Sequence, residues 1–168
     1  MNIKTIYADP PWMEVGGGKI KRGADRHYPL MKTNDICNLQ IIKELNIENA
    51  HLYLWVTNNF LIDGLKVMTA WGFKYITNIV WVKNKIGLGQ YFRGQHEICL
   101  FGRKGKLPYK IIDGKRQQSP SVLIADRTEH SKKPIEMYNI IEKVSYGDYI
   151  ELFARNKHNN WISWGNEI

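Results

Sequence analysis

The stretch Tyr7-Ala8-Asp9-Pro10-Pro11-Trp12 decides the fold around it. It closes a short apolar run, residues 3–8, whose length and composition predict a buried strand. Two consecutive prolines then end that strand, because proline can neither donate to a sheet ladder nor continue a helix. We therefore expect Asp9 at the carboxyl end of a strand, on backbone that the prolines stiffen. In open α/β sheets this edge is where ligands bind.

These residues allow two interpretations. A carboxylate and a large ring on a rigid ledge suit a flat ligand that bears an amino group. Alternatively, the stretch is only a strand followed by a proline turn, with Trp12 buried in the core. A short motif does not decide between them without its structural context.

The rest of the chain alternates apolar, β-branched segments with segments of helical periodicity. Such alternation predicts an α/β fold with a largely parallel sheet. A turn is expected at Asp113-Gly114, and residues 121–125 form a short apolar piece. The expected strands are 3–8, 51–57, 75–82, 96–102, 149–153 and 161–164, and the expected helices are 33–45, 60–71 closed by Gly72, and one that begins at Pro134.

The length of 168 residues and the absence of repeats, linkers and low-complexity segments predict one domain over residues 1–168. A separate target-recognition domain does not fit. No apolar run reaches the roughly 18 residues of a membrane helix. The chain begins directly with a predicted strand, so we expect no signal peptide and a cytoplasmic location.

Positive charge is the strongest compositional signal. The 24 Lys and Arg residues exceed the 16 Asp and Glu residues, which gives a net charge of +8. Such a balance favours polyanionic partners, nucleic acid first, although small domains also carry such charge for solubility alone. The basic residues concentrate in segments 19–26, 83–93 and 103–116, which favours nucleic acid. Our candidate contacts are Lys19, Lys21, Arg22, Arg26, Lys83, Lys85 and Arg93.

Several kinds of catalytic site find little support. There is no Walker loop and no Gly-x-Gly-x-x-Gly, so a phosphate cradle is not indicated. Cys37 and Cys99 lie far apart without ligand spacing, and the five histidines show no paired spacing, so we expect no metal. No serine or cysteine has a recognisable activating partner.

The motif Asp9-Pro10-Pro11-Trp12 resembles the Asp-Pro-Pro-Trp motif of the MT-A70 family of adenine methyltransferases. The resemblance extends over nearly the whole chain, and its strength lies in the order of the matching segments. These are residues 53–57, 79–83, 96–100, 130–134, 151–155 and 164–167.

This resemblance implies a Rossmann-like methyltransferase sheet, mostly parallel with helices on both faces, in which the catalytic motif precedes the cofactor segment. It also implies direct methyl transfer from S-adenosylmethionine to the 6-amino group of adenine. In that chemistry Asp9 and the carbonyl of Pro10 would accept hydrogen bonds from the amine. Pro11 would stiffen the ledge, and Trp12 would stack on the base.

The resemblance also implies a cofactor site. Lys133 would pair with the methionine carboxylate of the cofactor, or else be a solvated lysine at a helix start. Tyr28 would lie near the pocket, or simply anchor a loop, and Glu97 is read as packing support. The remaining cofactor residues would be Asp9, Arg155, Asn166 and Glu167.

Two features depart from the wider class of permuted amino-methyltransferases. In many members of that class the strand equivalent to residues 149–153 runs into a Phe-x-Gly-x-Gly loop, where this chain reads Phe153-Ala154-Arg155-Asn156. MT-A70 members share this departure, so Arg155 and its neighbours would supply side-chain contacts in place of backbone amides. The strand that usually follows the one carrying Glu167 is either missing or replaced by another element.

The resemblance leaves the polymer open. A compact member looks like a bacterial or phage DNA adenine methyltransferase, so we favour DNA over RNA. A non-catalytic nucleic-acid-binding subunit and cytosine amino methylation are alternatives. A homodimer or heterodimer also fits, because a partner subunit would help to read the sequence.

Overall fold

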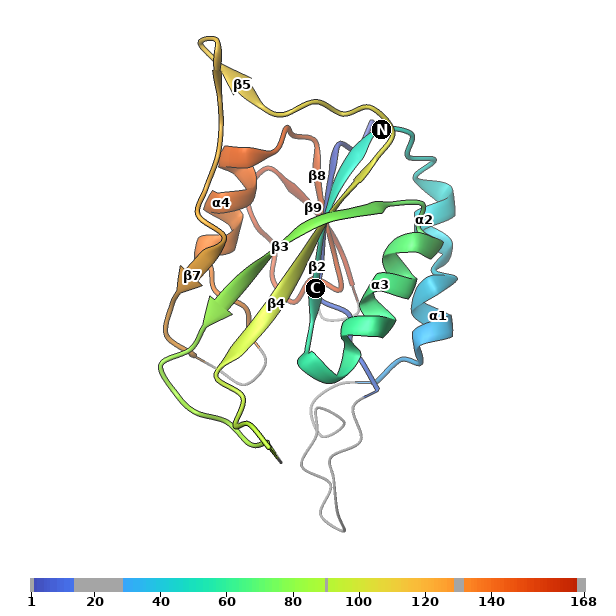
Figure 1. The fold of residues 1–168 in the computed structure, drawn as a ribbon. Helices are drawn as coiled ribbons and strands as arrows, with labels where there is room; N and C mark the ends of the chain where they lie inside the picture. The colour runs from blue at the N-terminus through green and yellow to red at the C-terminus, as the bar shows by residue number, and fades with distance from the viewer. Residues whose placement is uncertain (1, 14–28, 90, 129–131, 166–168) are drawn as a thin grey trace.

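A seven-stranded sheet forms the centre of the computed structural model, which describes residues 2–13, 29–89, 91–128 and 132–165 (Figure 1). The strand order is β7-β3-β4-β2-β1-β8-β9. Their bounds are β1 Thr5–Ala8, β2 Ala50–Val56, β3 Lys74–Val82, β4 His96–Lys104, β7 Val122–Ile124, β8 Tyr149–Leu152 and β9 Trp161–Trp164.

Strand direction decides which residues meet at one edge. All neighbouring strands are parallel except that β4 runs antiparallel to both β2 and β3. The carboxyl ends of β1, β2, β3 and β8 therefore lie at the same edge, and β4 begins there. Asp9, which follows β1, and Lys83, which follows β3, are placed at this edge together with the start of β4. The predicted largely parallel sheet is confirmed.

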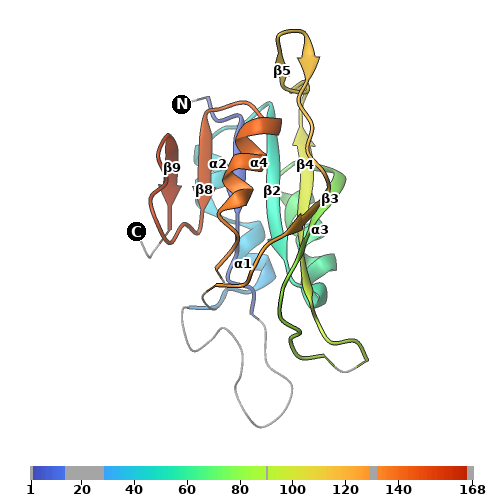
Figure 2. The ribbon, with the colours of Figure 1, turned by 90° about the vertical axis from the view of Figure 1, so that its left-hand side faces the viewer.

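Helices cover both faces of the sheet (Figures 1 and 2). On one face lie α1 Thr33–Cys37, α2 Gln40–Glu44, the 3₁₀ turn η2 Asn58–Phe60 and α3 Leu61–Ala70, and on the other lies α4 Glu136–Val144. None of the helices that the structure describes has the length and apolarity needed to cross a bilayer.

Strand β2 connects the two halves of the core, since it is buried along its whole length. Leu52 and Leu54 pack in the cluster that includes α1 and α3. Tyr53 and Trp55 alternate with them and pack on the other face against Met137 of α4. Because of this period-two alternation, each face of the sheet presents its own apolar surface to the helices that cover it.

The predicted helix over 33–45 is wrong in one respect, because the structure has two short helices there. At the break, Leu39 adopts an extended ψ of 122°. The side chain of Asn38 donates to the carbonyl of Asn34 at 2.8 Å, so a side chain competes with the backbone for the end of α1. Helix α3 ends as predicted, with Gly72 at φ +83°.

Two further turns test the sequence predictions. Asp113 and Gly114 both have positive φ and join β5 Ile111–Ile112 to β6 Lys115–Arg116, which confirms the predicted turn. Helix α4 begins at Glu136, slightly later than predicted. The carbonyl of Pro134 already accepts the N–H of Met137 at 3.1 Å, so a turn precedes the helix.

The two outermost strands of the sheet are β7 and β9. Strand β7 pairs in parallel with β3, where only a short apolar piece was expected. Strand β9 pairs only with β8, and no described residue adds a strand beyond it.

Candidate active site

The backbone of the Asp9-Pro10-Pro11-Trp12 motif is pinned on both sides. The N–H of Trp12 donates to the carbonyl of Pro10 at 2.9 Å, and the N–H of Met31 donates to the carbonyl of Pro11 at 2.8 Å. The N–H of Met13 returns a bond to Met31 at 3.2 Å. A carbonyl oxygen has two lone pairs, so Pro10 keeps one for a ligand. The motif therefore presents its acceptors from fixed backbone.

Four charged side chains of alternating sign meet beside this backbone. Lys133 Nζ lies 2.9 Å from Asp9 Oδ1 and 3.2 Å from Glu97 Oε2. The other oxygen of Glu97 accepts from Lys83 Nζ at 2.5 Å. We call this set (Asp9, Lys133, Glu97 and Lys83) the charge chain. It links the end of β1, the end of β3, the start of β4 and the segment before α4.

The charge chain is largely shielded from solvent. Its four side chains are between 11% and 20% exposed. The lysines also lie on tryptophan rings, with Lys133 Nζ 5.5 Å from the ring centre of Trp55 and Lys83 Nζ 4.8 Å from that of Trp81. Cation–π contacts of this kind stabilise a charge that has lost part of its water.

The pKa shifts show how the charges depend on one another. Burial raises the pKa of Asp9, and Lys133 opposes that rise. Burial would also raise the pKa of Glu97, but Lys133 and Lys83 outweigh it and hold the pKa below its ordinary value. Burial works against a charged Lys133, yet Asp9 and Glu97 together raise its pKa. The raised pKa keeps Lys133 protonated, and its charge favours the ionised, acceptor-only form of Asp9 against the effect of burial.

The predicted stacking role of Trp12 is wrong for this structure. Its side chain is 5% exposed, and its ring stacks on Phe60 at a centroid distance of 5.5 Å. Its Nε1–H donates to the carbonyl of Trp55 at 3.0 Å. Because the indole N–H finds an acceptor at the end of β2, the ring can be buried without an unpaired donor. Trp12 anchors the turn and leaves no open face for a base.

Of the residues predicted to hold a cofactor, Lys133 and Arg155 lie near Asp9. Lys133 is not the solvated lysine of the alternative interpretation. Arg155 is close enough to lower the pKa of Asp9. Tyr28, Asn166 and Glu167 lie outside the described residues.

The segment that replaces the glycine loop has its own geometry. Phe153, directly after β8, has φ +63°, a conformation that glycine adopts most easily. The N–H of Ala154 donates to the carbonyl of Trp164 at 3.0 Å, which ties the ends of β8 and β9 together. This bend precedes Arg155 and brings the residue toward the edge that carries Asp9.

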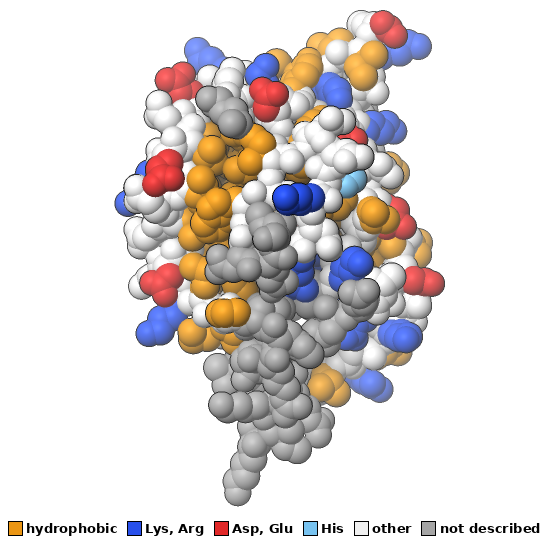
Figure 3. All heavy atoms as spheres, turned by 180° about the vertical axis from the view of Figure 1, so that it is seen from behind, with side chains coloured by type: hydrophobic (Ala, Val, Ile, Leu, Met, Phe, Trp, Pro, Cys, Tyr) orange, Lys and Arg blue, Asp and Glu red, His pale blue; other side chains and the backbone are white. Residues whose placement is uncertain are grey.

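The predicted nucleic-acid contacts are only partly assessed by the structure. Lys19, Lys21, Arg22 and Arg26 lie outside the described residues. The prediction that Lys83 contacts nucleic acid is wrong for this structure, because its ammonium pairs with Glu97 inside the charge chain and is not open to a phosphate. Lys85 and Arg93 are exposed. On the face shown in Figure 3, Lys and Arg side chains lie both near the middle and along the margins, where Asp and Glu side chains are interspersed with them.

Sequence reasoning missed two carboxylates near this edge. Glu97, interpreted as packing support, is the centre of the charge chain. Its partners Lys83 and Lys133 come from other parts of the chain, so no local sequence signal marks its role. Glu151 is 9% exposed and accepts from the Tyr138 hydroxyl at 2.8 Å. Nothing in the sequence marks Glu151 as buried beside a second carboxylate.

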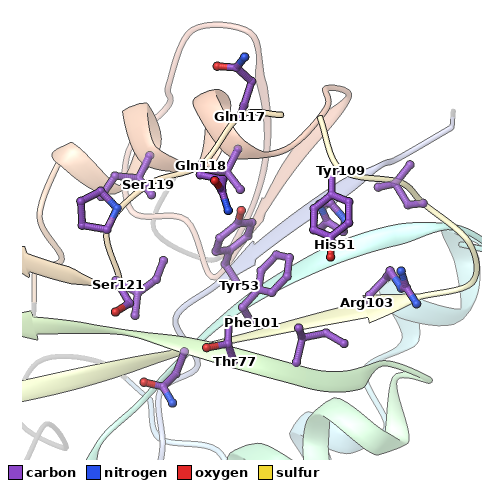
Figure 4. Close-up of a pocket in the computed structure, with 17 residues that line it drawn as sticks. His51, Tyr53, Thr77, Phe101, Arg103, Tyr109, Gln117, Gln118, Ser119 and Ser121 are labelled. Atoms are coloured by element: carbon purple, nitrogen blue, oxygen red, sulfur yellow. The ribbon is translucent and has the colours of Figure 1, made fainter. Parts of the chain in front are cut away.

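A cavity of about 370 Å³ lies elsewhere, on the α4 face beneath residues 107–121 (Figure 4). Two of its lining side chains share one hydrogen-bond partner, because Ser145 Oγ bonds both His51 Nδ1 at 2.8 Å and the Tyr53 hydroxyl at 2.7 Å. Burial lowers the pKa of His51 to about 4, so the ring is neutral at pH 7. No member of the charge chain lines this cavity, which is therefore separate from the candidate active site.

Glu151 gives a pH-dependent prediction. Burial, aided by the charge of Asp9, raises the pKa of Glu151 to about 7, against an ordinary value of 4.5. Between these values the native state holds a proton that the unfolded state has released, so stability falls as pH rises through this window. Glu151→Gln cannot ionise and still accepts from Tyr138. Its stability relative to wild type should rise by about 2 kcal/mol between about pH 5.5 and about pH 8.5.

Urea unfolding at both pH values measures this difference, and Glu136→Gln at an exposed position of α4 is the control. A Glu151→Gln difference that stays constant with pH would contradict the raised pKa.

The charge chain gives a second prediction. Glu97→Gln leaves two partly buried ammonium groups without their shared anion and should lower the free energy of unfolding by about 3 kcal/mol. Lys83→Met removes one of those ammonium groups, so adding it to Glu97→Gln should cost less than it does alone. A double-mutant cycle by urea unfolding should give a coupling of at least about 1 kcal/mol. Strictly additive effects would show that Glu97 and Lys83 of the charge chain do not stabilise each other.

Comparison with known proteins agrees with this geometry. The chain matches the MT-A70 family model over residues 3–167. It is 32% identical to the type II methyltransferase M.MunI of a Mycoplasma species, in an alignment that covers 98% of this chain and 77% of that protein.

Eukaryotic relatives match over the same length of this chain. It is 33% identical to a putative N(6)-adenosine-methyltransferase MT-A70-like protein of Medicago truncatula, covering 98% of this chain and 26% of that protein. It is 30% identical to human METTL3, an N(6)-adenosine-methyltransferase catalytic subunit, covering 98% and 28%. The chain spans most of the bacterial relative and a much smaller part of the plant and human ones. This chain belongs to the MT-A70 family.

Proposed function

We propose that this protein transfers a methyl group from S-adenosylmethionine to the 6-amino group of adenine in DNA. The observation that carries the proposal is the Asp9 carboxylate, paired with Lys133 at 2.9 Å at the carboxyl edge of the sheet. It stands beside the Pro10 carbonyl on pinned backbone, in a chain of a methyltransferase family.

The chemistry of the amine explains why two fixed acceptors matter. The lone pair of an exocyclic amine is delocalised into the adenine ring, so the nitrogen is a poor nucleophile. Hydrogen bonds from both N–H groups to Asp9 and Pro10 would favour a pyramidal nitrogen with a localised lone pair. Because the backbone is pinned before the substrate arrives, no reorganisation is needed during the reaction. Fixed alignment of the reactants supplies much of the remaining rate.

The donors beside Asp9 fit the carboxylate of a methionine-like cofactor. An ammonium group has three N–H bonds, and two of those on Lys133 face Asp9 and Glu97. The third, together with the nearby Arg155, would hold the cofactor carboxylate. When bound, S-adenosylmethionine supplies an electrophilic methyl group. Asp9 and Pro10 would orient the amine toward it, and Lys133 would favour the ionised form of Asp9, with no covalent enzyme intermediate.

DNA is the favoured polymer because this chain covers most of the type II methyltransferase M.MunI, whereas it covers only about a quarter of the relatives named for adenosine, the ribonucleoside. RNA is the second candidate, because those adenosine methyltransferases share about the same identity with this chain. A homodimer or heterodimer that supplies recognition residues is compatible with either polymer.

Transfer of a tritiated methyl group to DNA and RNA of matched sequence tests the substrate. Incorporation into DNA at least tenfold above RNA supports the proposal, and activity on RNA alone overturns the choice of DNA. Calorimetry with S-adenosylmethionine tests the class of function. A wild-type protein that binds no cofactor would be a non-catalytic subunit.

Substitution of Asp9 tests the mechanism. Asp9→Ala removes one of the two acceptors, and we expect kcat to fall by at least about 10²–10³-fold, as for other preorganised hydrogen-bonding groups. The rates are compared at saturating cofactor, with affinity measured by calorimetry, because Asp9 is also a predicted cofactor residue and the partner of Lys133. Asp35→Ala, at an exposed position of α1, is the control and should keep wild-type turnover. Turnover retained in Asp9→Ala would exclude this role for the carboxylate.

A further inference from the structure

The segment between β3 and β4 projects from the same edge of the sheet that carries Asp9 (Figures 1 and 2). Two members of the charge chain stand at its ends, Lys83 on one side and Glu97 on the other. The segment is therefore fixed at its base to the candidate active site.

The outer part of this segment is unusually apolar for its exposure. Tyr91 is 93% exposed and its neighbour Phe92 is 90% exposed. Leu88 is 74% exposed and Ile86 56% exposed. Single exposed apolar residues need no explanation, but a group of them marks a surface that contacts a partner. We call Tyr91 and Phe92 the aromatic tip.

Hydrogen bonds hold the base of the segment while the aromatic tip stands free of the core. The N–H of Gly87 donates to the carbonyl of Gly94 at 2.7 Å, and Arg93 Nε donates to the carbonyl of Gly87 at 3.0 Å. A Cβ on Gly87 would lie 3.0 Å from the Gly94 oxygen, so glycine permits this close pairing. The N–H of Lys83 also donates to Gln95 at 2.8 Å. The tip is thus presented on a braced support.

Charge and position identify the partner as nucleic acid. The exposed Lys85 and Arg93 flank the aromatic tip, in a chain of net charge +8. A target base in a duplex must leave the stack to reach Asp9, and that leaves a gap beside its neighbours. Apolar side chains inserted between base steps unstack and kink a duplex, and aromatic rings stack on bases of any sequence.

We propose that the aromatic tip inserts into a nucleic-acid duplex beside the target adenine and stabilises the state in which that adenine is extruded. This inference rests on the proposed function and adds the device by which a paired adenine reaches the site. Tyr91 and Phe92 act on the duplex and not on the reacting amine. Their importance therefore depends on whether the substrate is paired.

The first test compares methylation of the same DNA in native and heat-denatured form. Tyr91→Ala/Phe92→Ala should lose at least tenfold in kcat/KM on native DNA and less than threefold on denatured DNA. Tyr91→Phe/Phe92→Tyr keeps both rings and should restore activity on native DNA. Tyr109→Ala is the control. It removes another exposed ring, 57% exposed, that follows the far end of β4, and it should change kcat/KM on neither native nor denatured DNA.

The second test needs neither catalysis nor a known recognition sequence. Insertion unwinds DNA, so the wild type bound to closed circular plasmid during topoisomerase relaxation should lower the final linking number. At equal occupancy of the plasmid, Tyr91→Ala/Phe92→Ala should not do so, whereas Tyr91→Phe/Phe92→Tyr should.

These outcomes separate the inference from the proposed function. Unwinding that requires the rings, by a protein that does not methylate DNA, would keep the inference and reject the proposed function. Bound wild type that fails to unwind, or an alanine variant that unwinds equally, would overturn the inference. Equal losses on native and denatured DNA would also overturn it. So would sedimentation showing that the alanine variant changes oligomeric state, because the rings would then contact protein.

Discussion

The ion pair between Asp9 and Lys133, 2.9 Å apart, is the interaction on which the candidate active site depends. It joins the end of β1 to the segment that leads into α4, so it holds these two backbone segments together and pairs their opposite charges. Without Lys133, burial would push Asp9 toward its protonated form and weaken it as an acceptor. Glu97 is the second carboxylate that pairs with Lys133, and Lys83 extends the charge chain to the end of β3. One local arrangement therefore sets the ionisation of the proposed substrate acceptor.

The sheet makes this arrangement available from distant parts of the sequence. Parallel strands bring their carboxyl ends to one edge, which places Asp9 and Lys83 together. The reversed direction of β4 brings Glu97 to the same edge at the start of its strand. The braced segment that carries the aromatic tip connects β3 to β4. The proposed methyl transfer and the proposed duplex contact would therefore share one edge of one sheet.

The strands and the parallel sheet could be predicted from the sequence because they depend on local composition and period. The end of the strand at Asp9 could be predicted too, since two prolines stop it locally, but the hydrogen bonds with Met31 that pin the motif could not. The break at Asn38 was missed because it depends on one side-chain hydrogen bond within an otherwise helical pattern. The burial of Trp12 depends on a carbonyl 43 residues away, and the pairing of Lys83 depends on strand register. Such long-range partners leave no periodic signal in a single sequence.

The central claim, that this edge methylates adenine in DNA through Asp9, is tested most directly by nucleoside mass spectrometry. DNA and RNA would be taken from cells that express the wild-type chain or Asp9→Ala at equal levels. We predict N6-methyladenine in the DNA of cells with the wild type and its absence with the variant. DNA without N6-methyladenine despite folded wild-type protein, or equal levels with both chains, would contradict the account.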